Sequence, residues 1–269
     1  MSGNTSTLLR IENLKKHFQV GGGLLRKSKT VQAVNGLTFD ILRGETLGLV
    51  GESGCGKSTV ARAVMGLTPS QEGSVRFEGR ELRGLPAREL RALRANMAMM
   101  FQDPVGSLSP RLTIRALVTE PYRIHGAGDR ELDAEAKRLL EMVGLNADFG
   151  RRFPHQLSGG QARRVGVARA LAMDPKLIIA DEPTAGLDVS VQGEVLNLLA
   201  RLQRELGLSI LIITHNLNVV RHITDRMAIM YLGRFVEHGP TEQVFHHPRH
   251  PYTEALLSAN PEPDPDAAS

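Results

Sequence analysis

The chain has 269 residues, enough for one large or two small domains, and its 41% hydrophobic and 23% charged residues are ordinary for a globular protein. No apolar stretch approaches the ~18 residues that would span a membrane. The single cysteine, Cys55, excludes an internal disulfide and a multi-cysteine metal site. Residues 1–6 lack the pattern of a secretory signal, so we expect a cytoplasmic protein. The net charge of +4 suits a membrane surface, nucleic acid or simply a solvated basic surface.

Strands and helices alternate along the predicted chain. A short apolar run at 46–50 reads as a buried strand, and residues 58–67 after it read as a helix. Further strands are predicted at 8–14, 31–42, 74–77, 97–101, 177–180 and 209–214, with a flexible glycine-rich, basic link at 21–29. Residues 110–144 look helical, and leucines at helical spacing predict a helix at 191–206. This alternation predicts an α/β fold with a mostly parallel sheet covered on both faces.

The strongest motif lies between the strand at 46–50 and the helix that follows it. Residues 51–58 read Gly-Glu-Ser-Gly-Cys-Gly-Lys-Ser, a phosphate-binding loop that arises by chance in roughly 1 of 100 such chains. Gly51, Gly54 and Gly56 let the backbone wrap closely around phosphates. Lys57 supplies charge for the β- and γ-phosphates, and the Ser58 hydroxyl is suited to Mg²⁺. The loop therefore predicts binding of a nucleoside triphosphate, ATP, with Mg²⁺.

The remaining residues of this loop belong to the same predicted nucleotide site. They are Glu52, Ser53, Cys55 and Thr59. Cys55 has two interpretations, a small tolerated side chain or a regulatory thiol.

An acidic pair follows the apolar strand at 177–180. A carboxylate at that end of a strand faces the ligand crevice of an open α/β sheet, so Asp181 is predicted to hold Mg²⁺, through water. Glu182 is the candidate general base, or at least positions the attacking water. The alternative for the pair is a solvated strand end.

Two more polar residues end predicted strands. His215 follows the strand at 209–214 and is a candidate contact for the γ-phosphate, where charge develops. Gln102 follows the strand at 97–101, and its amide suits Mg²⁺ or the attacking water, the alternative being an ordinary polar strand end. His246, His247 and His250 are interpreted as tail residues, so we expect no metal there.

Aromatic residues make up only 4% of the chain, and Phe18 is one of them. It lies near the first strand and is predicted to stack on adenine. A core phenylalanine is the alternative, and neighbouring His17 could take the adenine role instead.

Taken in order, these motifs resemble one family over essentially the whole chain. The phosphate loop, Gln102, the pentapeptide Leu-Ser-Gly-Gly-Gln at 157–161, Asp181-Glu182, Asp188 and His215 are similar in order to ATP-binding-cassette (ABC) ATPase subunits. The pentapeptide arises by chance in about 1 of 1,000 such chains. The resemblance implies a RecA-like P-loop core with an antiparallel β subdomain, and a helical subdomain at about 103–160. We expect this domain to cover 1–259, and the proline-rich tail 260–269 to be disordered.

The resemblance also implies a dimer. Two such subunits pack head to tail, so that Ser158, Gly159, Gly160 and Gln161 of one chain close over ATP held by the other. Asp188 would lie at the dimer seam. ATP binding closes the dimer and hydrolysis opens it. A groove near Gln102 would receive a coupling helix from a membrane permease.

Finer similarities point to the peptide and nickel importer branch of the family. They lie at 101–104, 107–111, 188–192 and 230–233, and most strongly at 250–258, His-Pro-Tyr-Thr-Glu-Ala-Leu-Leu-Ser. The implied partners are a second ATPase subunit, two permeases and an external binding protein, at the cytoplasmic face of the membrane. Ser109, Arg163 and Gly186 depart from the usual family residues, but none of these changes removes a catalytic group.

Other functions stay open at this stage. A soluble ABC ATPase acting on DNA or ribosomes usually carries two cassettes or long coiled-coil insertions, and neither appears here. A simple P-loop kinase or GTPase does not carry the pentapeptide at 157–161. The cargo of an importer could be an oligopeptide, a dipeptide, a nickel chelate or an opine, because an ATPase subunit does not touch it.

Overall fold

The computed structural model describes residues 6–21, 29–101, 103, 106, 108–126 and 131–259. They form two compact units. We call residues 7–83 and 212–259 the β-rich unit, and residues 84–211 the helix-rich unit. One strand, β8 (Ser209–Thr214), begins in the helix-rich unit and ends in the β-rich unit.

The β-rich unit contains an antiparallel sheet with the strand order β2-β1-β4-β5. Its strands are β1 (Thr7–Val20), β2 (Lys29–Leu42), β4 (Glu72–Phe77) and β5 (Arg80–Glu81). β1 is longer than predicted, because residues 15–20 are held by pairing with β2 although none of their side chains is buried. Strand residues that are not buried need not alternate between apolar and polar side chains, so the strand pattern in the sequence ends at residue 14.

A second set of strands in this unit leads to the phosphate loop. β3 (Thr46–Val50) pairs in parallel with β9 (Arg226–Tyr231), which pairs antiparallel with β10 (Arg234–Pro240). All five residues of β3 are buried, as expected for a parallel strand covered on both faces. The helices are α1 (Lys57–Val64), α8 (Leu217–Ile223), α9 (Thr241–His246) and α10 (Pro251–Ala259).

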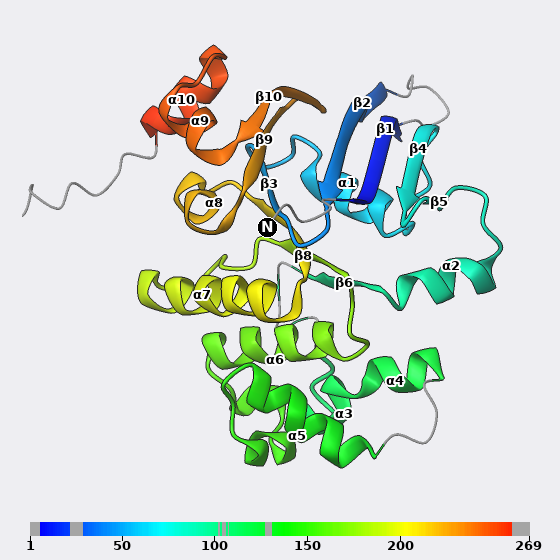
Figure 1. Ribbon diagram of the computed structural model, residues 1–269, viewed down its shortest axis with the longest axis vertical. Helices are drawn as coiled ribbons and strands as arrows, with labels where there is room; N and C mark the ends of the chain where they lie inside the picture. Colours follow the sequence, from blue (N-terminus) through cyan, green and yellow to red (C-terminus); the bar gives the residue numbers. More distant parts are fainter. Residues whose placement is uncertain are drawn as a thin grey trace, which may run out of the picture. The chain divides into compact units, whose positions relative to one another are not determined.

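The end of β3 is fixed by a core cluster. Val50, Leu217, Val220, Met227, Ile229 and Val244 make up this cluster, so it joins β3 and β9 to α8 and α9. Burying one such aliphatic side chain stabilises the fold by about 1.5–3 kcal/mol. Figure 1 shows α9 and α10 beside the end of β10. The core thus holds the point at which the chain leaves β3 for the loop.

The helix-rich unit is built around β6 (Met97–Met100) and β7 (Leu177–Asp181), which pair in parallel. Its strand order is β8-β7-β6. In Figure 1 helices α6 and α7 run side by side in this unit, and they are in contact. Its helices are α2 (Ala87–Arg94), α3 (Ile114–Val118), α4 (Glu120–His125), α5 (Leu132–Met142), α6 (Gly159–Leu171) and α7 (Val189–Leu206), with 3₁₀ turns at Ala147–Arg151 and Pro154–Gln156.

The predicted elements are present, with corrections at their ends. The helix predicted at 58–67 ends at Val64, since Gly66 takes a positive φ of 64° soon afterwards. The helical stretch predicted at 110–144 is three helices, α3, α4 and α5, and α4 ends where Gly126 caps it in a left-handed conformation. The link 22–28, Gln102 and the tail 260–269 lie outside the described residues.

The predicted α/β fold, with parallel strands, an antiparallel sheet and a helical region, is confirmed. Within the part of the chain that the structure describes, no helix combines the length and apolar character that a membrane crossing requires.

Candidate functional site

The phosphate loop connects buried β3 to α1, and glycines permit its path. Gly54 and Gly56 have φ values of 83° and 115°, a region that other residues rarely adopt. A Cβ on Gly56 would lie 2.0 Å from the carbonyl oxygen of Ala33, and one on Gly51 would lie 2.3 Å from that of Met230. These backbone atoms are hard neighbours, so the loop can follow this path only with glycine at both positions.

Lys57 is the first residue of α1, and its side chain is buried against the loop. Its Nζ donates hydrogen bonds to the carbonyl oxygens of Gly51, at 2.5 Å, and Glu52, at 2.9 Å. Both acceptors are neutral, whereas a phosphate oxygen would be a charged and stronger acceptor. The lysine is therefore held at the loop, with partners that an anionic ligand can replace.

The start of α1 suits an anion. Its first turn has no acidic residue, and Gly56 provides no side chain to cap it. A helix N-terminus of this kind offers backbone N–H groups and the positive end of the helix dipole. Ser58 is exposed in this first turn, so its hydroxyl is accessible.

Cys55 is buried within the loop, with 6% of its surface exposed. Burial is the largest effect on its thiol and raises its pKa, although Lys57 lies nearby. A thiol with a raised pKa is a poor nucleophile. This favours the interpretation of Cys55 as a small buried side chain.

The β-rich unit also carries His215 and Phe18. His215 is exposed directly after the buried strand β8, where the N–H of Asn216 bonds to the Thr214 hydroxyl. The Phe18 ring is 40% exposed, and the Nζ of Lys16 lies 5.1 Å from its centroid. A side chain this exposed does not belong to the core, so Phe18 is not a core phenylalanine. Its stacking on adenine stays a prediction.

In the helix-rich unit, β7 ends at the acidic pair. Asp181 and Glu182 are buried, with 7% and 9% of their surfaces exposed. Glu182 has a φ of 51°, a left-handed conformation that costs a non-glycine residue about 1–3 kcal/mol. Its carbonyl accepts a hydrogen bond from the N–H of Ala185. Strain of this kind is concentrated at functional sites, so the geometry supports a special role for Glu182.

Arg163 approaches the same turn from α6. Its Nη2 donates to the Ala185 carbonyl at 2.6 Å, and the side chain is buried. Burial lowers the pKa of Arg163, and the charges of Asp103 and Glu182 act against that shift. The sequence marked Arg163 only as a departure from the family pattern. The structure shows that it ties the helix of the pentapeptide to the turn after Glu182.

The pentapeptide begins α6. Ser158 caps the helix, since its hydroxyl accepts from the N–H of Gln161 while the Gln161 side chain accepts from the N–H of Ser158. The Ser-x-x-Gln spacing is the sequence signal for this reciprocal capping box, which is not among the sequence predictions above. Ser158, Gly160 and Gln161 line a surface cleft of about 370 Å³ together with Arg164 and Val191.

Asp188 has a structural function that the sequence analysis did not predict. Its Oδ1 accepts a hydrogen bond from the N–H of Val191 at 2.9 Å and so caps α7. The adjoining Val189 is 85% exposed, an unusual position for an aliphatic side chain in the first turn of a helix. The predicted place of Asp188 at a dimer seam is not tested by this contact.

The predicted site residues therefore fall into two groups. The β-rich unit contains Phe18, the loop residues Gly51, Glu52, Ser53, Gly54, Cys55, Gly56, Lys57, Ser58 and Thr59, and His215. The helix-rich unit contains Ser158, Gly159, Gly160, Gln161, Asp181, Glu182 and Asp188. Gln102 lies outside the described residues.

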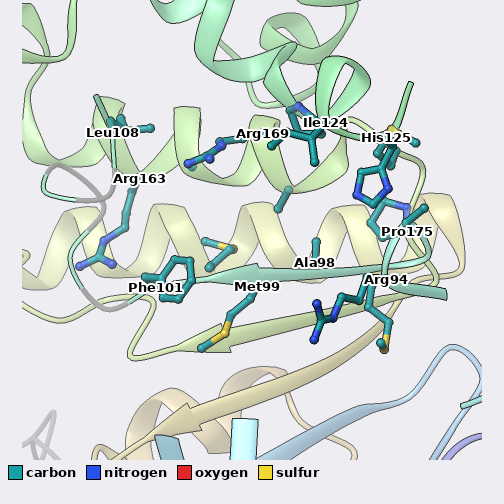
Figure 2. Close-up of a pocket in the computed structure, with 17 residues that line it drawn as sticks. Arg94, Ala98, Met99, Phe101, Leu108, Ile124, His125, Arg163, Arg169 and Pro175 are labelled. Atoms are coloured by element: carbon teal, nitrogen blue, oxygen red, sulfur yellow. The ribbon is translucent and has the colours of Figure 1, made fainter. Parts of the chain in front are cut away.

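A second cleft lies wholly within the helix-rich unit, close to the position of Gln102 in the chain. It has a volume of about 200 Å³. Figure 2 shows Met99 and Phe101 from the β6 segment on one side and Leu108, Ile124 and His125 on the other, with Arg94, Arg163 and Arg169 among the lining residues. Phe101 and Ile124 are 47% and 48% exposed. The cleft thus combines exposed apolar surface with cationic side chains.

Two protein-family models match the chain. One, described as "ABC transporter", matches residues 34–185, and the other, described as "Oligopeptide/dipeptide transporter, C-terminal region", matches residues 236–269. The oligopeptide transport ATP-binding protein OppF of Escherichia coli K12 is 50% identical over 96% of this chain and 79% of its own length. The putative oligopeptide transport ATP-binding protein YkfD of Bacillus subtilis is 49% identical over 96% of this chain and 78% of its own length.

Solved structures are similar as well. The dimeric ATP-binding cassette MJ0796 in a post-hydrolysis state with ADP and Pi has a TM-score of 0.77 and 30% identity, covering 87% of this chain and 98% of that one. The cassette cbiO1 of Clostridium perfringens, part of the ABC transporter complex cbiONQ, has a TM-score of 0.75 and 28% identity, covering 90% of this chain and 91% of that one.

Proposed function

Because the chain belongs to the ABC transporter family and is an ATPase subunit, we propose that it energises an importer of oligopeptides or dipeptides. The observation that carries this proposal is the 50% identity to OppF over 96% of the chain, together with the oligopeptide/dipeptide transporter match at 236–269. The cargo class rests on these similarities, because none of the site residues would touch a peptide.

The proposed chemistry uses residues from both groups. Lys57 would exchange its two carbonyl partners for the phosphates of ATP, and the N-terminus of α1 would hold their negative charge. Glu182 would orient and deprotonate the attacking water, and its buried, strained position supports that assignment. His215 and Gln102 are proposed to contact the γ-phosphate and the water.

Mg²⁺ fits the donor chemistry of the proposed site. The metal prefers oxygen ligands, and Ser58 offers an exposed hydroxyl while Asp181 offers a carboxylate at the end of β7. Gln102 could add an amide oxygen. When bound, the ion would neutralise charge on the phosphates.

The exposed start of α6 supports a role for the pentapeptide in a dimer. Ser158 and Gly160 line a surface cleft, and the N–H groups of that helix start favour an anion. We propose that this cleft covers ATP held by a second ATPase subunit, whether a copy of this chain or a related one. Asp188 and the exposed Val189 would then lie at the seam.

The second cleft is the proposed docking site for a membrane permease. Its exposed apolar surface would take the apolar side of a coupling helix, and methionines adapt to such a surface. The protein would then act at the cytoplasmic face of the membrane, with an external binding protein that delivers the peptide.

Co-purification tests the importer. We expect the full chain to be recovered with two multi-span membrane proteins and a second ATPase subunit. Its ATPase activity should rise when the peptide-loaded binding protein is added. Recovery with ribosomes or DNA would contradict the proposal. A binding protein that takes up nickel chelates or opines but no peptide would correct the cargo alone.

A matched pair of variants tests the docking site. Ile124→Asp would place a charge in the second cleft, whereas Leu206→Asp would place one at an equally exposed apolar position, since the two side chains are 48% and 46% exposed. We expect Ile124→Asp to lose permease binding while it keeps ATP binding, and Leu206→Asp to keep both. Equal recovery of permeases with both variants would place the docking site elsewhere.

A further inference from the structure

Tyr252 lies in the C-terminal motif His250–Ser258, whose resemblance to the peptide and nickel importer branch assigns no role to any single residue in it. It is the second residue of α10, and the start of that helix is firmly held. The Glu237 carboxylate accepts hydrogen bonds from the N–H groups of Arg249 and His250, and His250 Nδ1 accepts from the N–H of Tyr252. The backbone around Tyr252 is therefore fixed to β10.

The Tyr252 ring packs toward the strand that leads into the phosphate loop. Its centroid lies 4.4 Å from that of Tyr231, at the end of β9. The ring also packs against the core cluster that contains Val50, the last residue of β3. Tyr252 is thus held in place by contacts that do not involve its hydroxyl.

That hydroxyl reaches the loop itself. The N–H of Glu52 donates a hydrogen bond of 3.3 Å to the Tyr252 Oη. The same peptide group carries the Gly51 carbonyl, which accepts from Lys57 Nζ at 2.5 Å. One peptide plane, between Gly51 and Glu52, is therefore held on one side by Lys57 and on the other by Tyr252.

These two partners would respond differently to a nucleotide. Lys57 must turn from the Gly51 carbonyl to reach phosphate oxygens, so that side of the peptide loses its partner. Tyr252 carries no charge that phosphate would attract, and its ring is held by Tyr231 and the core. Its hydroxyl can thus keep the peptide oriented while Lys57 moves.

We propose that Tyr252 is a positioning residue of the phosphate loop, through which the C-terminal segment raises the affinity for ATP. The inference rests on the proposed nucleotide site. A loop that is already ordered loses less conformational entropy when a ligand binds, which is why a fixed peptide favours binding.

Tyr252→Phe tests the proposal because it removes the hydroxyl and keeps the ring. We expect the full chain to bind Mg·ATP up to about fivefold more weakly in calorimetry, because the loop is less ordered before binding and the free energy of one neutral hydrogen bond limits the loss. Without nucleotide, the melting temperature should fall by at most about 2–4 °C, because one neutral hydrogen bond contributes about 1 kcal/mol to stability. In the assembled transporter, KM for ATP should rise while kcat stays within twofold.

Tyr231→Phe is the matched control. It removes the hydroxyl of the other ring in the same pair, and we expect no change in affinity or KM. If the wild type binds Mg·ATP and Tyr252→Phe binds it equally well, this inference is wrong while the nucleotide site stands. If kcat, KM and melting temperature all deteriorate together, Tyr252 has only a structural role. If the wild type itself binds no nucleotide, the proposed function fails.

Amide hydrogen exchange gives a test that needs no variant. Without nucleotide, the Glu52 N–H should exchange more slowly than the N–H of exposed Ser53, because Tyr252 accepts its hydrogen bond, and adding Mg·ATP should not speed the exchange of the Glu52 N–H. Exchange at Glu52 as fast as at Ser53 without nucleotide, or faster exchange at Glu52 once Mg·ATP is added, would overturn the proposal.

Discussion

At the scale of single residues, two glycines that look alike in the sequence differ in how much room the structure leaves for a side chain. Gly54 and Gly56 are both loop glycines with positive φ. A Cβ on Gly54 would meet no atom within 4 Å, whereas one on Gly56 would meet the Ala33 carbonyl at 2.0 Å. Glu182 differs from both, because it is not a glycine and yet has the positive φ that glycine favours. Positions like these depend on neighbours that are distant in sequence.

The two loop glycines give a matched prediction. Gly54→Ala should cost about 1 kcal/mol of stability, the penalty of a left-handed conformation for alanine. Gly56→Ala should cost about 3 kcal/mol, because overpacking against backbone adds to that penalty. Thermal denaturation of the full chain measures both. Equal losses of stability in the two variants would mean that the loop moves away from Ala33 without cost.

At the scale of elements, α6 shows why some helices are not predicted from the spacing of apolar residues in the sequence. Its buried side chains lie on all sides of the helix and include small residues such as Ala162 and Ala168, so it has no single apolar stripe. Its position comes from packing against α3, α5, α7 and β6, and the capping box at Ser158 sets where the helix begins. A Cβ on Gly160 would lie 2.7 Å from Val191 Cγ1 of α7, so the two helices approach closely at the pentapeptide.

This close approach predicts a coupled pair of substitutions. Gly160→Ala should destabilise the protein by about 1–3 kcal/mol, and Val191→Ala in the same chain should recover part of that loss. Gly166→Ala is the control in the same helix, since its Cβ would meet nothing within 4 Å, and it should stabilise by about 0.5–1 kcal/mol. Denaturant unfolding gives the values. Strict additivity of the pair would argue against contact at this point.

At the scale of the whole molecule, the division of the site residues into two groups is relevant to the proposed dimer. The phosphate loop and the pentapeptide belong to different units of one chain. The proposed dimer would let the pentapeptide of each chain serve the ATP held by the other. The related cassette MJ0796 is described as dimeric after hydrolysis, with ADP and Pi.

Glu182→Gln tests both hydrolysis and assembly. The amide keeps the size of the side chain but cannot accept the proton of water, so we expect turnover to fall by about 10²–10⁴-fold while ATP binding is retained. Size-exclusion chromatography with Mg·ATP should then show a dimer, because the closed state is not released by hydrolysis. Glu205→Gln, at the exposed end of α7, should behave like the wild type. Wild-type turnover in Glu182→Gln would remove Glu182 as the base.

Local patterns in the sequence are enough to predict the family, the α/β fold, and the residues proposed for ATP and Mg²⁺. A phosphate loop is contiguous, and buried parallel strands appear as short apolar runs. The contacts that hold the loop and the turn after Glu182 follow from the packing of distant segments. Tyr252 is 200 residues from Glu52, and Arg163 is 22 residues from Ala185, so their hydrogen bonds leave no trace in any local pattern. Such contacts arise when distant segments pack together, which local spacing does not encode.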